Sequence, residues 1–175
     1  MFYLLSFIFY LLSFIFYLLS MKNHHYKITV QWTGNKGTGT SGYRDYERNH
    51  TISAENKVVI EGSSDPAFRG DRTKHNPEDM LLSSLSSCHM LWYLHFCSEA
   101  GIIVTNYTDE ATGTMVETAS GSGHFTEVTL HPTVTVAEES MIKKAEQLHH
   151  KASEFCFIAN SVNFPVKHIP TTLVK

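Results

Sequence analysis

Two cysteines stand in sequence contexts that suit thiol chemistry. Cys88 lies in the helix-like segment SSLSSCHML, and Cys156 lies in ASEFCFIANSVNFPV, beside a second helix-like segment. One thiol that reacts with an oxidant and another that condenses with it are enough for a thiol-based redox enzyme. If Cys88 and Cys156 reach one site, the chain has this chemistry. If they do not, it is an ordinary domain with buried thiols.

Ionisation alone does not make Cys88 an efficient catalyst. An ordinary thiol is about 3% ionised at neutral pH, so complete ionisation gains only ~30-fold in rate, or about 2 kcal/mol. Enzymes commonly reach about 10⁶-fold. A second group must therefore stabilise charge on the leaving atom, which for a peroxide is oxygen. Arginine suits this role, with a carboxylate to orient it. Glu78 is the best-placed carboxylate, and the candidate arginines are Arg44, Arg48, Arg69 and Arg72.

The segment 77–100 carries the clearest helix signal in the chain. Asn76 suits the N-cap, Pro77 the first helical position, and Glu78 and Asp79 the negatively charged first turn, while Gly101 ends the helix. Its length of about 23 residues corresponds to about 35 Å. So long an apolar helix in a small domain is expected at its centre or at a subunit interface.

Helix geometry separates Glu78 from Cys88 within one chain. Ten residues correspond to about 15 Å along the axis and about 80° around it, so the two side chains cannot meet on one straight helix. Either an arginine bridges this gap, or Glu78 approaches Cys88 of a second chain whose helix packs antiparallel. We favour the second arrangement, a dimer with a shared site. Close approach of two helices would be allowed by small residues: Ser83, Ser84, Ser86 and Ser87.

The remaining cysteine and the histidines receive structural interpretations. Cys97 follows Cys88 by nine residues, which places it on the opposite side of the helix as a core thiol. His95 shares the face of Cys88 two turns away and is interpreted as a packed or surface imidazole, while His89 points elsewhere. The neighbouring pair His149-His150 lacks the one-face spacing of a helical metal site.

The other elements follow from alternation and turn signals. A strand is predicted at 26–32, a hairpin from 43–53 and 57–61, two long strands at 102–117 and 124–136, a second helix at 138–155, and a last strand at 164–173. Strands and helices do not alternate as βαβ units, so the fold class is α+β.

Composition limits the function classes. The chain has 175 residues, 14 basic and 17 acidic residues, and a formal charge of −3. It has no basic stripe, so no nucleic-acid partner is expected. Three cysteines are too few for a secreted disulfide scaffold. We predict one domain, residues 21–175.

The first twenty residues differ from the rest. FYLLSFI recurs from Phe2, Phe9 and Phe16, and Met21 follows. One interpretation is a repetitive nucleotide tract translated ahead of the true start at Met21. The other is a membrane anchor, since about 20 apolar residues can span a bilayer. A cleaved signal peptide would need a basic n-region, which is missing.

Three stretches of the chain resemble the OsmC/Ohr family, the osmotically inducible and organic hydroperoxide resistance proteins. They are HNPEDMLLSSLSSCHMLWYLHFC, GHFTEVTLHPTV and CFIANSVNFPV. The resemblance covers nearly all of residues 21–175 and excludes the repeat. SSDPAFRGD and CHMLWYLHFC are most similar to the OsmC-like branch.

The resemblance implies an OsmC-like α+β fold, with antiparallel sheets around a long central helix, and an intertwined homodimer. It also implies thiol-dependent reduction of organic hydroperoxides in the cytoplasm. Cys88 matches the peroxide-attacking cysteine, which passes through a sulfenic acid, and Cys156 matches the resolving cysteine. No bound cofactor is implied, because an external dithiol, of lipoyl type, is the expected reductant.

The resemblance also assigns the charged residues. Glu78 matches the family glutamate. Arg69, before NPE, fits the OsmC pattern with a one-residue length difference, whereas Arg44, in GYRDY, fits the position used in the Ohr branch. We favour Arg69 and keep Arg44 as the alternative. An apolar peroxide pocket is expected, with Met90, Trp92 and Phe157 as candidate lining residues; Phe157 replaces the proline that many members carry after the second cysteine.

Two other functions are weighed against the peroxidase. One is a non-catalytic OsmC-like domain that senses redox state or binds a small ligand through an oxidisable thiol. The other is a hydrolase or acyltransferase with Cys88 as nucleophile, for which no Cys-His-Asn/Asp set is evident.

Overall fold

Residues 22–175 are described by the computed structural model. The heptapeptide repeat lies outside the described residues. No helix between residues 22 and 175 has both the length and the apolar character needed to cross a bilayer.

Two α-helices and nine strands make up this part of the chain. Their bounds are β1 (Thr29–Trp32), β2 (His50–Ser53), β3 (Ile60–Gly62), α2 (Pro77–Glu99), β4 (Val104–Asp109), β5 (Thr112–Glu117), β6 (Gly123–Leu130), β7 (Pro132–Val136), α3 (Ile142–Phe155), β8 (Val166–His168) and β9 (Thr171–Val174). Short 3₁₀ turns lie at Pro66–Phe68, Glu139–Met141 and Ala159–Ser161. The α+β class and the second helix are therefore confirmed.

The predicted start of α2 is confirmed in detail. The Asn76 side chain accepts a hydrogen bond from the Asp79 N–H at 2.7 Å, and the Asp79 carboxylate accepts one from the Asn76 N–H at 3.3 Å. This capping box satisfies two helix donors that would otherwise lack partners. Gly101, with φ of +71°, ends the helix in the left-handed region that glycine adopts without strain.

The strands form three small three-stranded sheets within residues 22–175: β1-β2-β3, β4-β7-β9 and β5-β6-β8. The expectation of purely antiparallel sheets is wrong, because β6 pairs with β8, and β7 with β9, in parallel. After α3 the chain runs through β8 and β9 in the same direction as through β6 and β7, so the two pairs of strands are parallel.

The two long strands and the terminal strand predicted from the sequence are each broken into two. The breaks fall at residues 110–111, at His131 and at residues 169–170. Asp109 links the first break, at residues 110–111, to the second, at His131. One of its carboxylate oxygens accepts a hydrogen bond from the His131 N–H at 2.7 Å, and the other accepts one from Ser86 on α2. Pro132 and Pro170 cannot donate to a ladder. Each predicted long strand therefore leaves one sheet and enters the other at its break.

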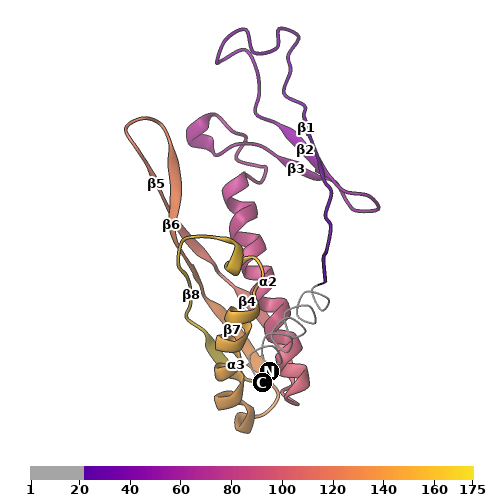
Figure 1. The fold of residues 1–175 in the computed structure, drawn as a ribbon, viewed down its shortest axis with the longest axis vertical. Helices are drawn as coiled ribbons and strands as arrows, with labels where there is room; N and C mark the ends of the chain where they lie inside the picture. Colours follow the sequence, from indigo (N-terminus) through magenta and orange to yellow (C-terminus); the bar gives the residue numbers. More distant parts are fainter. Residues whose placement is uncertain (1–21) are drawn as a thin grey trace, which may run out of the picture.

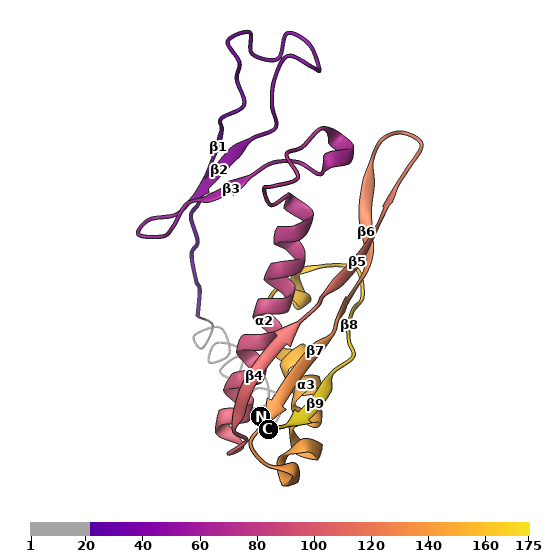
Figure 2. The same ribbon diagram turned by 180° about the vertical axis from the view of Figure 1, so that it is seen from behind.

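Two hydrophobic clusters pack along α2. Near its N-terminal half, Leu85 packs with Val128 and Leu130 of β6. Near its C-terminal half, a larger cluster joins α2 to β7 and α3: Tyr93, Phe96, Cys97, Val134, Val136, Ala145, Leu148 and Ala152. Figures 1 and 2 show the β5–β6 hairpin beside the first half of the helix, and β4, β7 and α3 beside the second.

The β1-β2-β3 sheet lies apart from the rest of the chain. Figure 1 shows it beyond the N-terminal end of α2, away from α3 and the other two sheets. Apolar side chains of its strands are largely uncovered, with Val30 60%, Trp32 41% and Ile60 45% exposed. We call residues 22–62 the arm. The register places Val30, Ile52 and Ile60 side by side on one face of the sheet, and residues 22–175 leave this apolar face largely uncovered.

Candidate functional site

The structure brings Cys88 and Cys156 together. Cys88 is half-buried in the middle of α2, and Cys156 is buried at the C-cap of α3, 1% exposed. Their thiols are close enough for each to affect the titration of the other, and both are free. Two cysteines far apart in sequence therefore meet at the junction of the two helices, which is the arrangement that a reversible disulfide needs.

The surroundings of Cys156 hold it in the thiol form. Burial, reinforced by the neighbouring Cys88 thiol, raises the pKa of Cys156 to about 11, although the Ala159 N–H, 3.4 Å from Sγ, acts in the opposite direction. Because this pKa lies far above neutrality, Cys156 carries its proton at pH 7 and is available as a hydrogen-bond donor to the Cys88 sulfur.

The chain after α3 is fixed by local hydrogen bonds. Cys156 leaves the helix with an extended backbone, φ −68° and ψ 105°. The Asn160 N–H donates to the Cys156 carbonyl at 3.0 Å, and the Asn160 side chain donates to the Glu154 carbonyl at 2.9 Å. The Ser161 hydroxyl donates to the Phe157 carbonyl at 2.7 Å. These bonds set the position of Cys156 without a proline after it.

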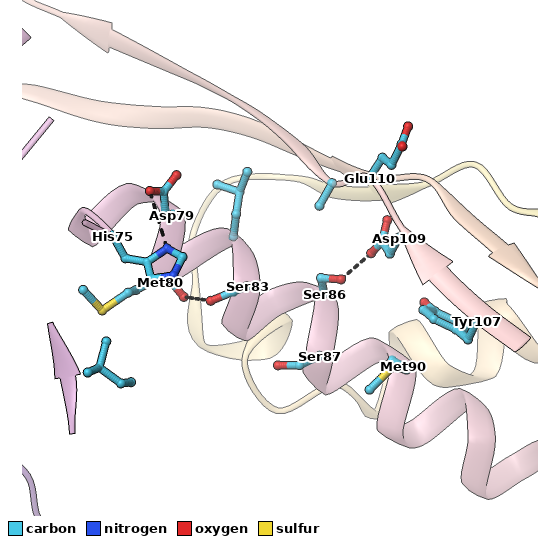
Figure 3. A pocket seen from close by; sticks show the side chains of 13 residues that line it. His75, Asp79, Met80, Ser83, Ser86, Ser87, Met90, Tyr107, Asp109 and Glu110 are labelled. Carbon is cyan, nitrogen blue, oxygen red and sulfur yellow. Dashed lines mark hydrogen bonds and ion pairs between the residues drawn. The ribbon is translucent and has the colours of Figure 1, made fainter. Parts of the chain in front are cut away.

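Aromatic side chains adjoin the cysteine pair. Trp92, one helical turn after Cys88, lies 5.4 Å from Phe155 and 5.6 Å from Phe157 between ring centroids. Phe157 is 62% exposed. Of the three residues predicted to line an apolar pocket, Trp92 and Phe157 come together beside the thiols. Met90 instead lines a separate groove on α2 (Figure 3).

That groove has a volume of about 810 Å³ and lies between β3, the N-terminal half of α2 and the β4–β5 turn. Ser83, Ser86 and Ser87 face it, together with Tyr107 and Asp109 (Figure 3). The serine-rich side of α2 is therefore left open by residues 22–175. Figure 3 also shows Ser86 bonded to Asp109, which fixes one wall of the groove to the helix.

Glu78 has an unsatisfied carboxylate oxygen. Its Oε2 is buried and has no hydrogen-bond partner among the described residues. Asp79, not Glu78, closes the capping box, so Glu78 is free for another role. A buried, unpaired carboxylate oxygen is costly, and the cost disappears when a cation or donor approaches it.

No arginine reaches Cys88 or Glu78 within residues 22–175. Arg69 and Arg44 are exposed and form no ion pair in this part of the chain. Arg69 caps the 3₁₀ turn at Pro66–Phe68 with φ of +66°. Arg48 is held by the carbonyls of Tyr43 and Tyr46, at 2.9 and 2.6 Å. One chain therefore does not assemble the predicted cysteine, arginine and glutamate set.

The structural interpretation of Cys97 and His95 is confirmed. Cys97 is 1% exposed in the larger core cluster. Burial raises its pKa, which opposes reactivity. His95 is on the surface, 3.4 Å from the Glu99 carboxylate. Sequence reasoning missed the burial of His89 and His149, which hydrogen-bond to each other at 3.0 Å. The sequence contained a signal for this burial, because His89 and His149 lie at helical spacing from the buried apolar residues of α2 and α3.

Comparison with known proteins agrees with this architecture. An OsmC-like protein of unknown function from Vibrio cholerae has 30% identity and a TM-score of 0.75, with 86% of this chain and 100% of that one covered. An organic hydroperoxide resistance protein from Elizabethkingia anophelis has 20% identity and a TM-score of 0.62, covering 88% and 100%. One from Legionella pneumophila has 16% identity and a TM-score of 0.61, covering 86% and 99%.

The latter two likenesses show the fold alone, and no curated protein matches the chain. The family model described as OsmC-like protein matches residues 70–170, which include α2, both cysteines of the pair and Glu78. The chain belongs to the OsmC-like family, which includes peroxidases.

Proposed function

We propose that the protein is a thiol peroxidase that reduces organic hydroperoxides. The observation that carries the proposal is the adjoining pair of free thiols, Cys88 half-exposed on α2 and Cys156 buried at the end of α3. The family supplies the reaction class, and the aromatic side chains of Trp92 and Phe157 beside the pair favour a substrate with an organic substituent.

The first step is attack of the Cys88 thiolate on the distal oxygen of the hydroperoxide. The O–O bond breaks, Cys88 becomes a sulfenic acid, and the alkoxide leaves and takes a proton to become the alcohol. Cys156 then attacks the sulfenic sulfur, which forms the disulfide and releases water. An external dithiol, of lipoyl type by family resemblance, restores both thiols and leaves as a disulfide. This cycle suits the reducing cytoplasm.

A homodimer completes the site in this proposal. Three observations support it: the buried Glu78 oxygen without a partner, the open serine-lined face of α2, and the uncovered apolar arm. A second chain would fill the groove with its own helix and bring an arginine to Glu78. Arg69 is our choice, with Arg44 as the alternative. That arginine would stabilise the alkoxide leaving group.

A non-catalytic redox sensor is the second candidate. It is favoured by one observation, the absence of any arginine near Cys88 in residues 22–175. The thiols of such a protein would be oxidised slowly by peroxide, and the protein would not catalyse repeated cycles of peroxide reduction. The two candidates therefore differ in rate and in the requirement for a reductant.

One experiment separates the two. Reduced protein is mixed with one equivalent of cumene hydroperoxide, and thiols are counted by mass spectrometry at intervals of seconds. The peroxidase loses two thiols, mapped to a Cys88–Cys156 disulfide, and then consumes further peroxide when dihydrolipoamide is added. Cys97→Ala serves as the matched control, and it should still form the Cys88–Cys156 disulfide and consume further peroxide with dihydrolipoamide. Absence of oxidation after minutes at equimolar peroxide would rule out the peroxidase.

A further inference from the structure

Three imidazoles gather between α2, α3 and β8. His89 Nε2 lies 3.0 Å from His149 Nδ1, with the two rings nearly parallel at 7°. The ring centroid of His168 lies 5.5 Å from that of His89 and 6.4 Å from that of His149. His89 and His149 are buried, at 1% and 0% exposure. No metal-ion site of three or more ligands is present in residues 22–175.

The groups that face this cluster offer little compensation for a positive charge. Tyr93 stacks on His149 at 3.8 Å between centroids and adjoins Cys97 and Tyr107. Asp109 on β4 favours charge on His89, but weakly, since its oxygens are bonded to Ser86 and to the His131 backbone. Glu146 on α3 is near Tyr93, and the imidazole of His150 is 6.4 Å from His168. No carboxylate bonds to either buried ring in the described part of the chain.

The hydrogen bond leaves no good place for an added proton. If His89 donates, a proton on His149 Nδ1 turns two N–H groups toward each other and breaks the bond, whereas a proton on His89 Nδ1 keeps the bond but places a charge on a ring that is 1% exposed. If His149 donates, its Nε2 is the free acceptor, and a proton there is buried without a partner. Both tautomers therefore oppose protonation while α2 and α3 stay packed.

The cluster also lies where it can control the cysteine spacing. His89 is the residue after Cys88 on α2, and His149 precedes Cys156 by seven residues, or about two helical turns, on α3. The His89–His149 bond is thus a direct link between the two helices that carry the thiols.

We propose that His89, His149 and His168 form an acid-sensitive lock, which keeps α3 on α2 and Cys156 against Cys88 at neutral pH and releases Cys156 in acid. The effect on peroxide turnover rests on the proposed function, but the lock itself does not.

The direction of the pH effect follows from the pKa shifts. Burial, the largest cause, lowers the pKa of His149 to about 3 and that of His89 to about 4, and it also lowers the pKa of His168. An opened or unfolded state has ordinary imidazoles with a pKa near 6.5. Below about pH 6.5 the open state binds more protons, so its population rises by up to about tenfold per pH unit for each histidine involved.

The first test follows the imidazole NMR signals of the full-length protein from pH 8 to pH 4.5. We expect His89 and His149 to stay neutral until the fold opens cooperatively. Independent titration of His89 and His149 near pH 6.5, with α2 and α3 still packed, would overturn the lock. This measurement needs no variant of the cluster.

The second test measures release of Cys156. In a Cys88→Ala background, labelling of Cys156 by 4,4′-dithiodipyridine is compared between the native cluster and the double variant His89→Leu, His149→Phe. The two proteins are compared at the same pH, so that the effect of pH on the thiolate fraction of Cys156 is the same in both. We expect rates within about threefold at pH 7 and at least about tenfold faster labelling of the native cluster at pH 5.

The control His95→Leu removes an exposed imidazole from the same helix and keeps the native response. Equal labelling of native and double-variant proteins at pH 5 would reject the proposal. If the double variant does not fold, the NMR titration decides. Neither test uses peroxide, so a protein without peroxidase activity could still have the lock.

Discussion

The thiol of Cys156, at the C-cap of α3, adjoins the thiol of Cys88 in the middle of α2. One thiol is half-exposed and the other buried, so the partners are not equivalent. The exposed member is suited to meet a peroxide, and the buried member to wait for the sulfenic acid. This asymmetry leads to separate predictions for the two cysteines.

Substitution of either cysteine distinguishes the two chemical steps. Cys88→Ser should abolish peroxide consumption, because the hydroxyl is a poor nucleophile at neutral pH. Cys156→Ser should leave the first step intact, so that a sulfenic acid accumulates on Cys88 and is trapped by dimedone, while turnover stops. Stopped-flow peroxide consumption and mass spectrometry measure both. Disulfide formation in Cys156→Ser between Cys88 and Cys97 would contradict the placement of Cys97 in the core.

The arginine can be identified by paired substitutions. Arg69→Ala should lower kcat/KM by about 10²–10³-fold, because it removes the group that stabilises the leaving oxygen. Arg44→Ala should lower it by less than about threefold. The reverse result would assign the role to Arg44. Glu78→Gln should reduce kcat/KM by about tenfold or more, since its carboxylate orients the arginine.

Mixing of inactive chains tests whether the site is shared. A Cys88→Ser chain and a Glu78→Gln chain, unfolded and refolded together, form heterodimers in which one site has an intact cysteine and an intact glutamate from different chains. About a quarter of the wild-type activity should return. A site contained in a single chain would give no recovery, so an inactive mixture would contradict the shared site.

The arm and the groove predict a dimer. Ile60 on β3 lines the groove and is 45% exposed. A lysine there places a charge in the surface that the second chain covers. Ile60→Lys should therefore shift the protein toward the monomer in light scattering, with a loss of activity. Ser140→Lys, an exposed position with the same change of charge, is the matched control. A monomeric and fully active wild-type protein would exclude the dimer.

The buried thiol predicts a loss of stability in alkali. The folded-state pKa of Cys156, about 11, is higher than the value of about 9 for a free thiol. The unfolded chain therefore loses its proton first, and the stabilisation present below about pH 9 disappears between pH 9 and 11. The difference amounts to roughly 3 kcal/mol. Urea midpoints of wild type and Cys156→Ala, compared from pH 8 to 11, isolate this contribution; a constant difference would contradict it.

Local residue patterns were sufficient for the helices. Asn76, Pro77 and Gly101 define α2 because caps act through bonds within a few residues. The helical repeat also placed Cys97 opposite Cys88, since both lie on one rigid element. The same logic failed for the long strands, because the break at His131 depends on the Asp109 carboxylate, which is distant in sequence.

The sequence by itself determined which residues are reactive types, where α2 begins and ends, and that Glu78 and Cys88 of one helix cannot meet. Only the tertiary structure decided that Cys88 and Cys156 are neighbours, that Met90 and Trp92 face different spaces, and that His89 and His149 pair in the core. The physical reason is the distance along the sequence over which each interaction acts. Caps and helical periods are set by neighbouring residues, whereas a thiol or imidazole pair depends on how α3 packs against α2.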